Sequence, residues 1–139
     1  MNTPRERIEA ESARRGSRAF AAGCVGLLTG STDDPELLRC LGGPGADKFL
    51  DGARHDDTYW LRVWALRGLL WSWHESATDS VCEALRDESW RVREMAAKVV
   101  ARHLVAEAFR AVADLREDAV PRVRVVADRA LVRLTDAGA

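Results

Sequence analysis

The chain has 139 residues, of which 47% are hydrophobic and 31% are charged, and 21 basic against 22 acidic side chains leave a formal net charge of -1. This length suits one domain with one core, and the composition excludes a disordered, fibrous or membrane-spanning protein. Because the net charge is close to zero, nucleic acid or anionic lipid would need a segregated patch of basic side chains.

The first 45 residues have a helical pattern of their own. Phe20, Cys24 and Leu27 recur at steps of three and four residues, which predicts a core-facing helix within residues 5–28, interrupted near Gly16. Asp34 followed by Pro35 is a typical helix start, and we expect this second helix to run to about residue 41. Four residues, Gly-Gly-Pro-Gly, then separate this segment from the rest of the chain.

From residue 46 onward the sequence repeats with a period of 31 residues. Equivalent positions hold residues of the same type in three copies: Asp56, Asp87 and Asp118; Leu61, Val92 and Val123; Arg62, Arg93 and Arg124; Ala65, Ala96 and Ala127. A fixed period of this length is typical of repeat architectures, in which each repeat is one supersecondary unit that stacks on its neighbours.

Each copy predicts two helices. A short helix precedes the Asp, a turn carries it, and a longer helix of about 14 to 17 residues follows, with apolar residues at three- and four-residue steps. The Asp suits a helix N-cap, because its carboxylate can accept hydrogen bonds from unpaired amides. Strand patterns are absent, so the predicted class is all-α, as an α-α superhelix of antiparallel helix pairs.

This register resembles the HEAT-like repeat family of armadillo-type α-solenoids. In that family an Asp in the turn is followed six residues later by an Arg, and these side chains form a ladder between successive repeats. The matching pairs are Asp56 with Arg62, Asp87 with Arg93, and Asp118 with Arg124. The resemblance implies three repeats in residues 46–139. We interpret residues 1–45 as a helical N-terminal cap or degenerate repeat, because a solenoid end needs a polar outer surface, and we expect one structural domain overall.

One face of the longer helices carries cations and tryptophans in equivalent positions. We name this set the predicted ridge: Trp60, Arg67, Trp71, Arg91, Lys98, Arg102, Arg122, Arg129 and Arg133. The resemblance implies that this face lines the concave, partner-binding side of the superhelix. The alternative is a solvated helix face, neutralised in part by local pairs such as Glu94 with Lys98.

Catalytic and metal chemistry have little support in the sequence. The three histidines, His55, His74 and His103, fall in different repeats, and the three cysteines form no CxxC pair, which favours a reducing cytoplasm and no metal or cofactor. HEAT-like DNA glycosylases share a basic face and tryptophans, but Asp56, Asp87 and Asp118 are already explained as ladder and cap residues. We therefore expect no catalytic residues.

The expected function is that of a non-catalytic interaction module or adaptor in the cytoplasm. The predicted ridge would bind an acidic or aromatic-containing segment of a protein partner. The alternative is nucleic-acid or phosphate binding through the same ridge, and no membrane partner is expected. A homodimer through the solenoid ends is a third expectation, because the last helix carries apolar residues with no following repeat to cover them: Val125, Val126, Leu131, Val132 and Leu134.

Overall fold

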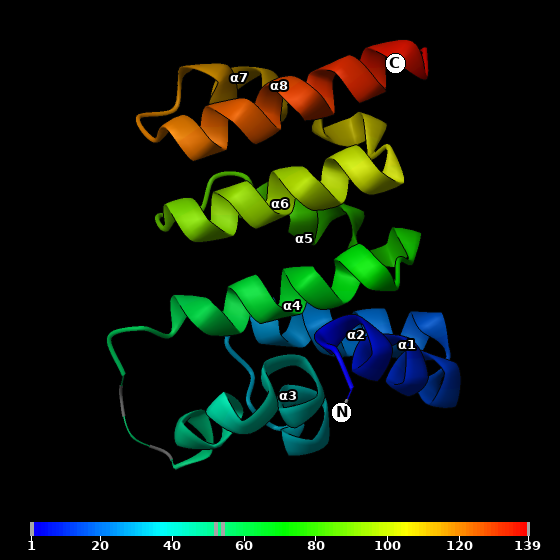
Figure 1. Ribbon diagram of the computed structural model, residues 1–139, viewed down its shortest axis with the longest axis vertical. Coiled ribbons are helices and arrows are strands. Elements are labelled where there is room, and N and C mark those ends of the chain that lie inside the picture. Colours follow the sequence, from blue (N-terminus) through cyan, green and yellow to red (C-terminus); the bar gives the residue numbers. More distant parts are fainter. Residues whose placement is uncertain (1, 52, 54, 139) are drawn as a thin grey trace. The chain divides into compact units, whose positions relative to one another are not determined.

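The computed structural model describes residues 2–51, 53 and 55–138, and every regular element within them is a helix (Figure 1). The predicted all-α class is thereby confirmed, with helices packed as consecutive pairs. The chain divides into two compact units, Met1–Ala77 (unit 1) and Thr78–Ala139 (unit 2). Among the described helices, none combines the length and apolar character needed to cross a membrane.

Unit 1 begins with two helices separated by one glycine. Helix α1 (Pro4–Arg15) starts with a capping box, in which Thr3 and Glu6 each accept a hydrogen bond from the backbone amide of the other. Helix α2 (Ser17–Leu28) follows Gly16, whose φ of 91° is readily adopted only by glycine. The predicted interruption near Gly16 is confirmed.

The remainder of unit 1 comprises α3 (Pro35–Gly42), the 3₁₀ helices η1 (Gly43–Leu50) and η2 (Glu75–Ala77), and α4 (Tyr59–Trp71). Asp34 caps α3 by accepting a hydrogen bond from the Leu37 amide at 3.1 Å, as its position before Pro35 predicts. A methyl group at Gly68 would lie 2.8 Å from both Cys24 Sγ and Leu41 Cδ2. Glycine at this position therefore lets α4 close on α2 and α3.

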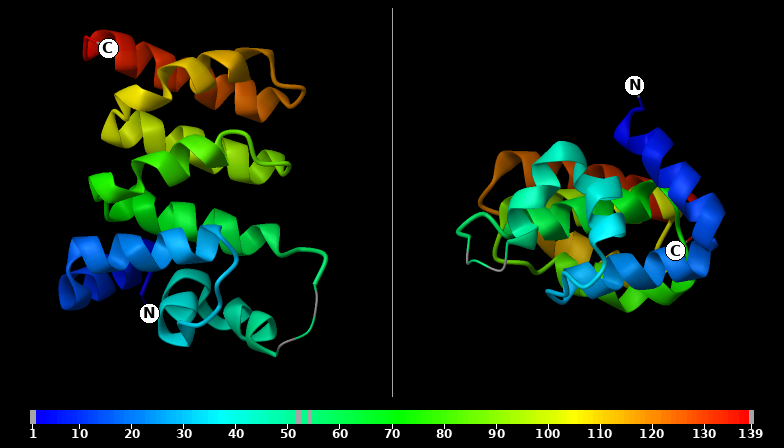
Figure 2. Two further views of the ribbon diagram at one scale, coloured as in Figure 1. Left: turned by 180° about the vertical axis from the view of Figure 1, so that it is seen from behind. Right: turned by 90° about the horizontal axis from the view of Figure 1, so that it is seen from below.

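Unit 2 contains the second and third repeats. Its helices are α5 (Thr78–Ala84), α6 (Trp90–His103), η3 (Ala106–Ala108), α7 (Phe109–Asp114), η4 (Leu115–Glu117) and α8 (Pro121–Asp136). Within this unit α6 and α8 lie side by side (Figures 1 and 2). Val92 and Ala96 on α6, and Val123 and Ala127 on α8, are fully buried in the predicted register. Helices α4, α6 and α8 have 13, 14 and 16 residues, close to the predicted lengths.

The repeated aspartates do not cap these helices as predicted. The N-cap residues are Thr58, Ser89 and Val120, each two positions after an Asp. Asp87 accepts a hydrogen bond from the Ser89 amide and Asp118 from the Val120 amide, both at 2.9 Å. The carboxylate thus closes a turn on the N-cap residue itself, because an Asp side chain easily reaches the amide two residues ahead.

Candidate partner-binding surface

Within unit 2, two ladder residues from successive repeats form a bidentate ion pair. Arg93 on α6 donates from Nε to Asp118 Oδ2 at 2.8 Å and from Nη2 to Asp118 Oδ1 at 3.2 Å. Asp118 has a side-chain exposure of 7% and Arg93 one of 16%, so the pair is shielded from solvent. Bidentate pairs between an arginine and a carboxylate are among the stronger hydrogen bonds in proteins.

Each ladder arginine of unit 2 also bonds to the ladder aspartate of its own repeat, through the backbone carbonyl of that aspartate. Arg93 Nη1 donates to the Asp87 carbonyl at 2.8 Å, and Arg124 Nη1 donates to the Asp118 carbonyl at 2.6 Å. Burial favours a raised pKa for Asp118, but the hydrogen bonds from Arg93 and from the Val120 amide outweigh it, so its pKa is lowered. This carboxylate therefore stays charged and holds the two repeats of unit 2 together.

The ladder residues of the first repeat lie in unit 1. Asp56 is exposed, two residues before the N-cap of α4. Arg62 is half-buried on α4 and lines a pocket of about 480 Å³ together with His55 and Thr58. The pairing of Asp56 with Arg62 stays a prediction.

One cation of the predicted ridge, Arg122, is already neutralised. Its guanidinium donates two hydrogen bonds to Glu94, at 2.9 and 3.1 Å, and it is 66% exposed whereas Glu94 is 11% exposed. Arg122 also lies over the Trp90 ring, 5.0 Å from its centroid, and Arg91 lies 4.5 Å from the same ring. The predicted pairing of Glu94 with Lys98 is wrong, because the carboxylate reaches the neighbouring helix α8 instead.

Four further cations of the predicted ridge on α6 and α8 form what we call the basic face of unit 2: Lys98, Arg102, Arg129 and Arg133. Each helix contributes two of them, four residues apart, so they share one side of that helix. Arg133 reaches α6, where its Nε donates to the Ala101 carbonyl at 2.5 Å. Lys98 is half-buried and Arg129 exposed, and neither forms an ion pair with any residue that the structure describes.

In unit 1, Arg67 and Trp71 of the predicted ridge contact the N-terminal segment. Arg67 is half-buried and donates from Nη2 to the Leu41 carbonyl at the end of α3. The Arg5 guanidinium of α1 lies 4.3 Å from the centroid of the Trp71 ring. Trp60 packs beside Tyr59, with ring centroids 5.3 Å apart. Sequence reasoning missed Arg5, because residues 1–45 lie outside the 31-residue register.

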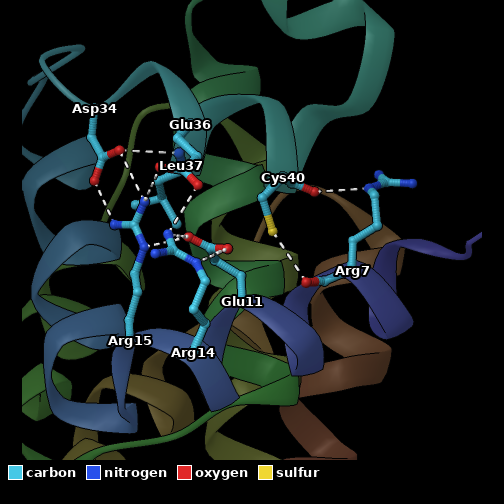
Figure 3. A network of polar contacts seen from close by, with 8 residues as sticks. All are labelled: Arg7, Glu11, Arg14, Arg15, Asp34, Glu36, Leu37 and Cys40. Carbon is cyan, nitrogen blue, oxygen red and sulfur yellow. Dashed lines mark hydrogen bonds and ion pairs between the residues drawn. The ribbon is translucent and has the colours of Figure 1, made fainter.

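A network of ion pairs joins α1 to the start of α3 (Figure 3). Arg15 donates to both oxygens of Asp34, at 2.6 and 3.1 Å, and to Glu11 at 2.5 Å, while Arg14 bridges Glu11 and Glu36. The Arg15 hydrogen bonds lower the pKa of Asp34, and the Arg14 hydrogen bond is the largest effect lowering the pKa of Glu11. Both carboxylates are held in the charged form.

The described residues contain no group of three or more His, Cys, Asp or Glu side chains arranged to hold a metal ion.

Burial raises the pKa of the Cys24 thiol, which fits the small core residue expected there. His74 bonds Ser76 locally, with Nδ1 and Oγ 2.8 Å apart. His55 lies 3.1 Å from Asp51 and packs against the edge of Phe49.

The apolar residues of α8 fall into two groups. Val126 and Leu134 are buried within unit 2, whereas Val125 and Val132 are 58% and 59% exposed. Leu131 and Val132 line a shallow groove of about 490 Å³ together with Arg116 and Asp128. The expectation of self-association through the last helix therefore depends on Val125, Val132 and this groove.

The family model for HEAT repeats matches residues 46–132. The match begins with the first predicted repeat, extends into the third, and covers more than half of the chain. No curated protein and no solved structure matches the chain.

Proposed function

The chain belongs to the HEAT repeat family, whose members typically act as protein-interaction scaffolds and are usually non-catalytic. From this premise we propose that it is a non-catalytic interaction module, and that the predicted ridge binds an acidic segment of a protein partner. The part of the predicted ridge with the most support is the basic face of unit 2. The N-terminal segment, residues 1–45, serves as the cap of the repeat array.

One observation carries the proposal: α6 and α8 together carry more cations than carboxylates. The carboxylate of Glu94 on α6 is bonded to Arg122 on α8. Asp128 pairs with Arg116 of η4, at 3.4 Å. Lys98 and Arg129 are left with no carboxylate partner in the part of the chain that the structure describes. An acidic segment would supply the missing charge, and Trp90, which lies against Arg91 and Arg122 on the same two helices, offers an aromatic contact.

The alternative ligand is a nucleic-acid backbone, which presents the same negative charge to the same side chains. The two ligands differ in their response to salt. Affinity for a nucleic acid falls steeply, with a slope of about -0.9 in log K against log salt for each phosphate neutralised. A peptide held partly by apolar contacts with tryptophan responds less.

The test is an affinity capture from a lysate of the source organism, analysed for both proteins and nucleic acids. The natural chain is compared with the double variant Lys98→Glu, Arg129→Glu, which reverses two charges that have no internal carboxylate partner. Arg18→Glu is the control for a charge reversal elsewhere, because Arg18 is exposed on α2 in unit 1. The proposal requires a protein that the double variant loses and the control retains. Equal recovery by all three chains contradicts it, and recovery of nucleic acid alone selects the alternative.

A further inference from the structure

Two arginines of unit 1, Arg7 and Arg67, are partly withdrawn from water without an acidic partner. Both are half-buried, and neither forms an ion pair with any carboxylate in the described residues. The more exposed Arg14 contacts two carboxylates, Glu11 and Glu36. This inverts the usual pattern, because charges withdrawn from water are normally paired.

Both guanidinium groups bind the C-terminal end of α3. Arg7 donates from Nε to the Cys40 carbonyl at 3.0 Å, and Arg67 donates from Nη2 to the adjacent Leu41 carbonyl. These carbonyls lie at the negative end of the helix dipole, which stabilises the cations in part. The α3 carbonyls engage one N–H of each group. Arg7 Nη1 also donates to the Asn2 carbonyl at 3.1 Å, whereas Arg67 Nε is buried with no hydrogen-bond partner.

The two positive charges also act on each other. Burial lowers the pKa of Arg67, and the nearby Arg7 charge lowers it further. No carboxylate offsets these effects for Arg67. The end of α3 therefore holds two like charges with unused donors and no counter-charge of its own.

The turn after α3 passes close to these groups. Gly43 has a φ of 63°, and a methyl group there would lie 3.3 Å from Arg7 Nη2. A methyl group at Gly42 would lie 2.6 Å from the Trp64 ring. Glycine at position 43 leaves Arg7 Nη2 uncovered by a side chain of this turn, and glycine at position 42 lets the indole of Trp64 pack against the same turn.

We propose that Arg7 and Arg67 form a binding site for one oxyanion, the carboxylate of an acidic side chain on the protein partner. Two guanidinium groups on adjacent carbonyls can present several N–H donors to the two oxygens of a carboxylate. The site deepens the proposed function and rests on it, because it names a carboxylate anchor in unit 1. Inorganic phosphate is the other source of the same chemistry, and the experiment below separates the two.

The test follows the arginine Nε–H resonances of the full chain by NMR during titration with acetate, hexaglutamate or inorganic phosphate at constant ionic strength. We expect acetate and hexaglutamate to give saturable shifts of the Arg7 and Arg67 resonances. The resonances of Arg14 and Arg15, which already bind carboxylates, serve as internal controls and should not move. Shifts with phosphate alone, no saturable shift, or equal shifts at all arginines would overturn the proposal.

A variant pair separates the site from general charge. Arg7→Gln should weaken hexaglutamate binding about tenfold, a typical loss for one hydrogen bond to a charged group. Arg18→Gln removes an equal charge from α2 and should leave the affinity unchanged, and a thermal melt shows that each variant folds. Equal weakening by both variants contradicts the site.

The site and the proposed function can fail separately. The double variant Lys98→Glu, Arg129→Glu alters unit 2 alone, so the acetate-induced shifts of Arg7 and Arg67 must persist in it. If they persist while no partner protein is captured by the natural chain, the proposed function fails and the anion site stands. If a partner is captured but acetate and hexaglutamate leave these resonances unmoved, only the site fails.

Discussion

The N-terminal segment and the repeats of unit 2 use arginine in different ways. In α1, Arg14 and Arg15 contact carboxylates of α1 and of the start of α3. In α6 and α8, Arg93 binds an aspartate of the next repeat, while Arg124 and Arg133 bind backbone carbonyls. The first arrangement neutralises charge locally, whereas the second consumes few carboxylates and leaves a net positive face.

The largest effect on stability is expected from removal of the ladder arginine in unit 2. Arg93→Ala leaves Asp118 charged and shielded and also frees the Asp87 carbonyl, so we expect a loss of about 3 kcal/mol in the free energy of unfolding. Arg124→Ala, which loses a hydrogen bond to a backbone carbonyl and a weaker charge interaction with Asp118, should cost about 1 kcal/mol. Urea unfolding measures both, and equal losses would contradict the role given to the Arg93–Asp118 pair.

Acid should destabilise both regions, because each depends on carboxylates that acid protonates. The folded-state pKa values of Asp118, Asp34 and Glu11 are lowered, so their stabilising contributions are complete above the unfolded-state values, near pH 4. These contributions are lost as the pH falls through the lowered folded-state values. Urea unfolding from pH 7 to pH 2 should show this decline. In the Asp118→Asn variant the decline should be shallower, and an unchanged slope would contradict the lowered pKa of Asp118.

A smaller loss is expected from the N-terminal network. Arg15→Ala removes the contacts with Asp34 and Glu11, but Asp34 is 41% exposed and water screens the interaction, so we expect about 1 kcal/mol. Urea unfolding provides the measurement, and Arg39→Ala, which breaks only an exposed surface pair with Asp47, is the control with a loss near zero. A loss as large as that of Arg93→Ala would remove the contrast between the two regions.

The smallest effect on stability belongs to the basic face. Lys98→Glu together with Arg129→Glu should change the free energy of unfolding by no more than about 0.5 kcal/mol, because neither side chain holds a carboxylate partner in the described structure. The same variant should lose partner binding in the capture experiment. A large destabilisation would show that these cations are structural rather than available to a partner.

Self-association provides a further test of the last helix. Val132→Asp places a charge on an exposed apolar position of α8, where it should leave folding intact. If α8 mediates a homodimer, sedimentation analysis should show association of the natural chain that rises with concentration and is absent in the variant. Val99→Asp is no substitute, because Val99 is fully buried and its variant would unfold.

Helix boundaries were predictable where the determinant is local. Gly16 ends α1 through its own backbone conformation, and Asp34 caps α3 through an amide three residues ahead. Partners across repeats were not predictable. Glu94 had Lys98 within reach on its own helix, yet it pairs with Arg122, 28 residues away, because α8 lies alongside α6. Arg67 fitted the outward register, and only the packing of α3 against α4 turned it toward the Leu41 carbonyl.

The sequence by itself determined the all-α class, the 31-residue register and the alternation of short and long helices. These follow from hydrophobic periodicity and turn residues, which act over a few positions along the chain. The tertiary structure alone decided which cations are neutralised, which bind carbonyls and which remain for a partner. A long arginine side chain can reach several neighbours, and its choice among them depends on which helix is packed beside it.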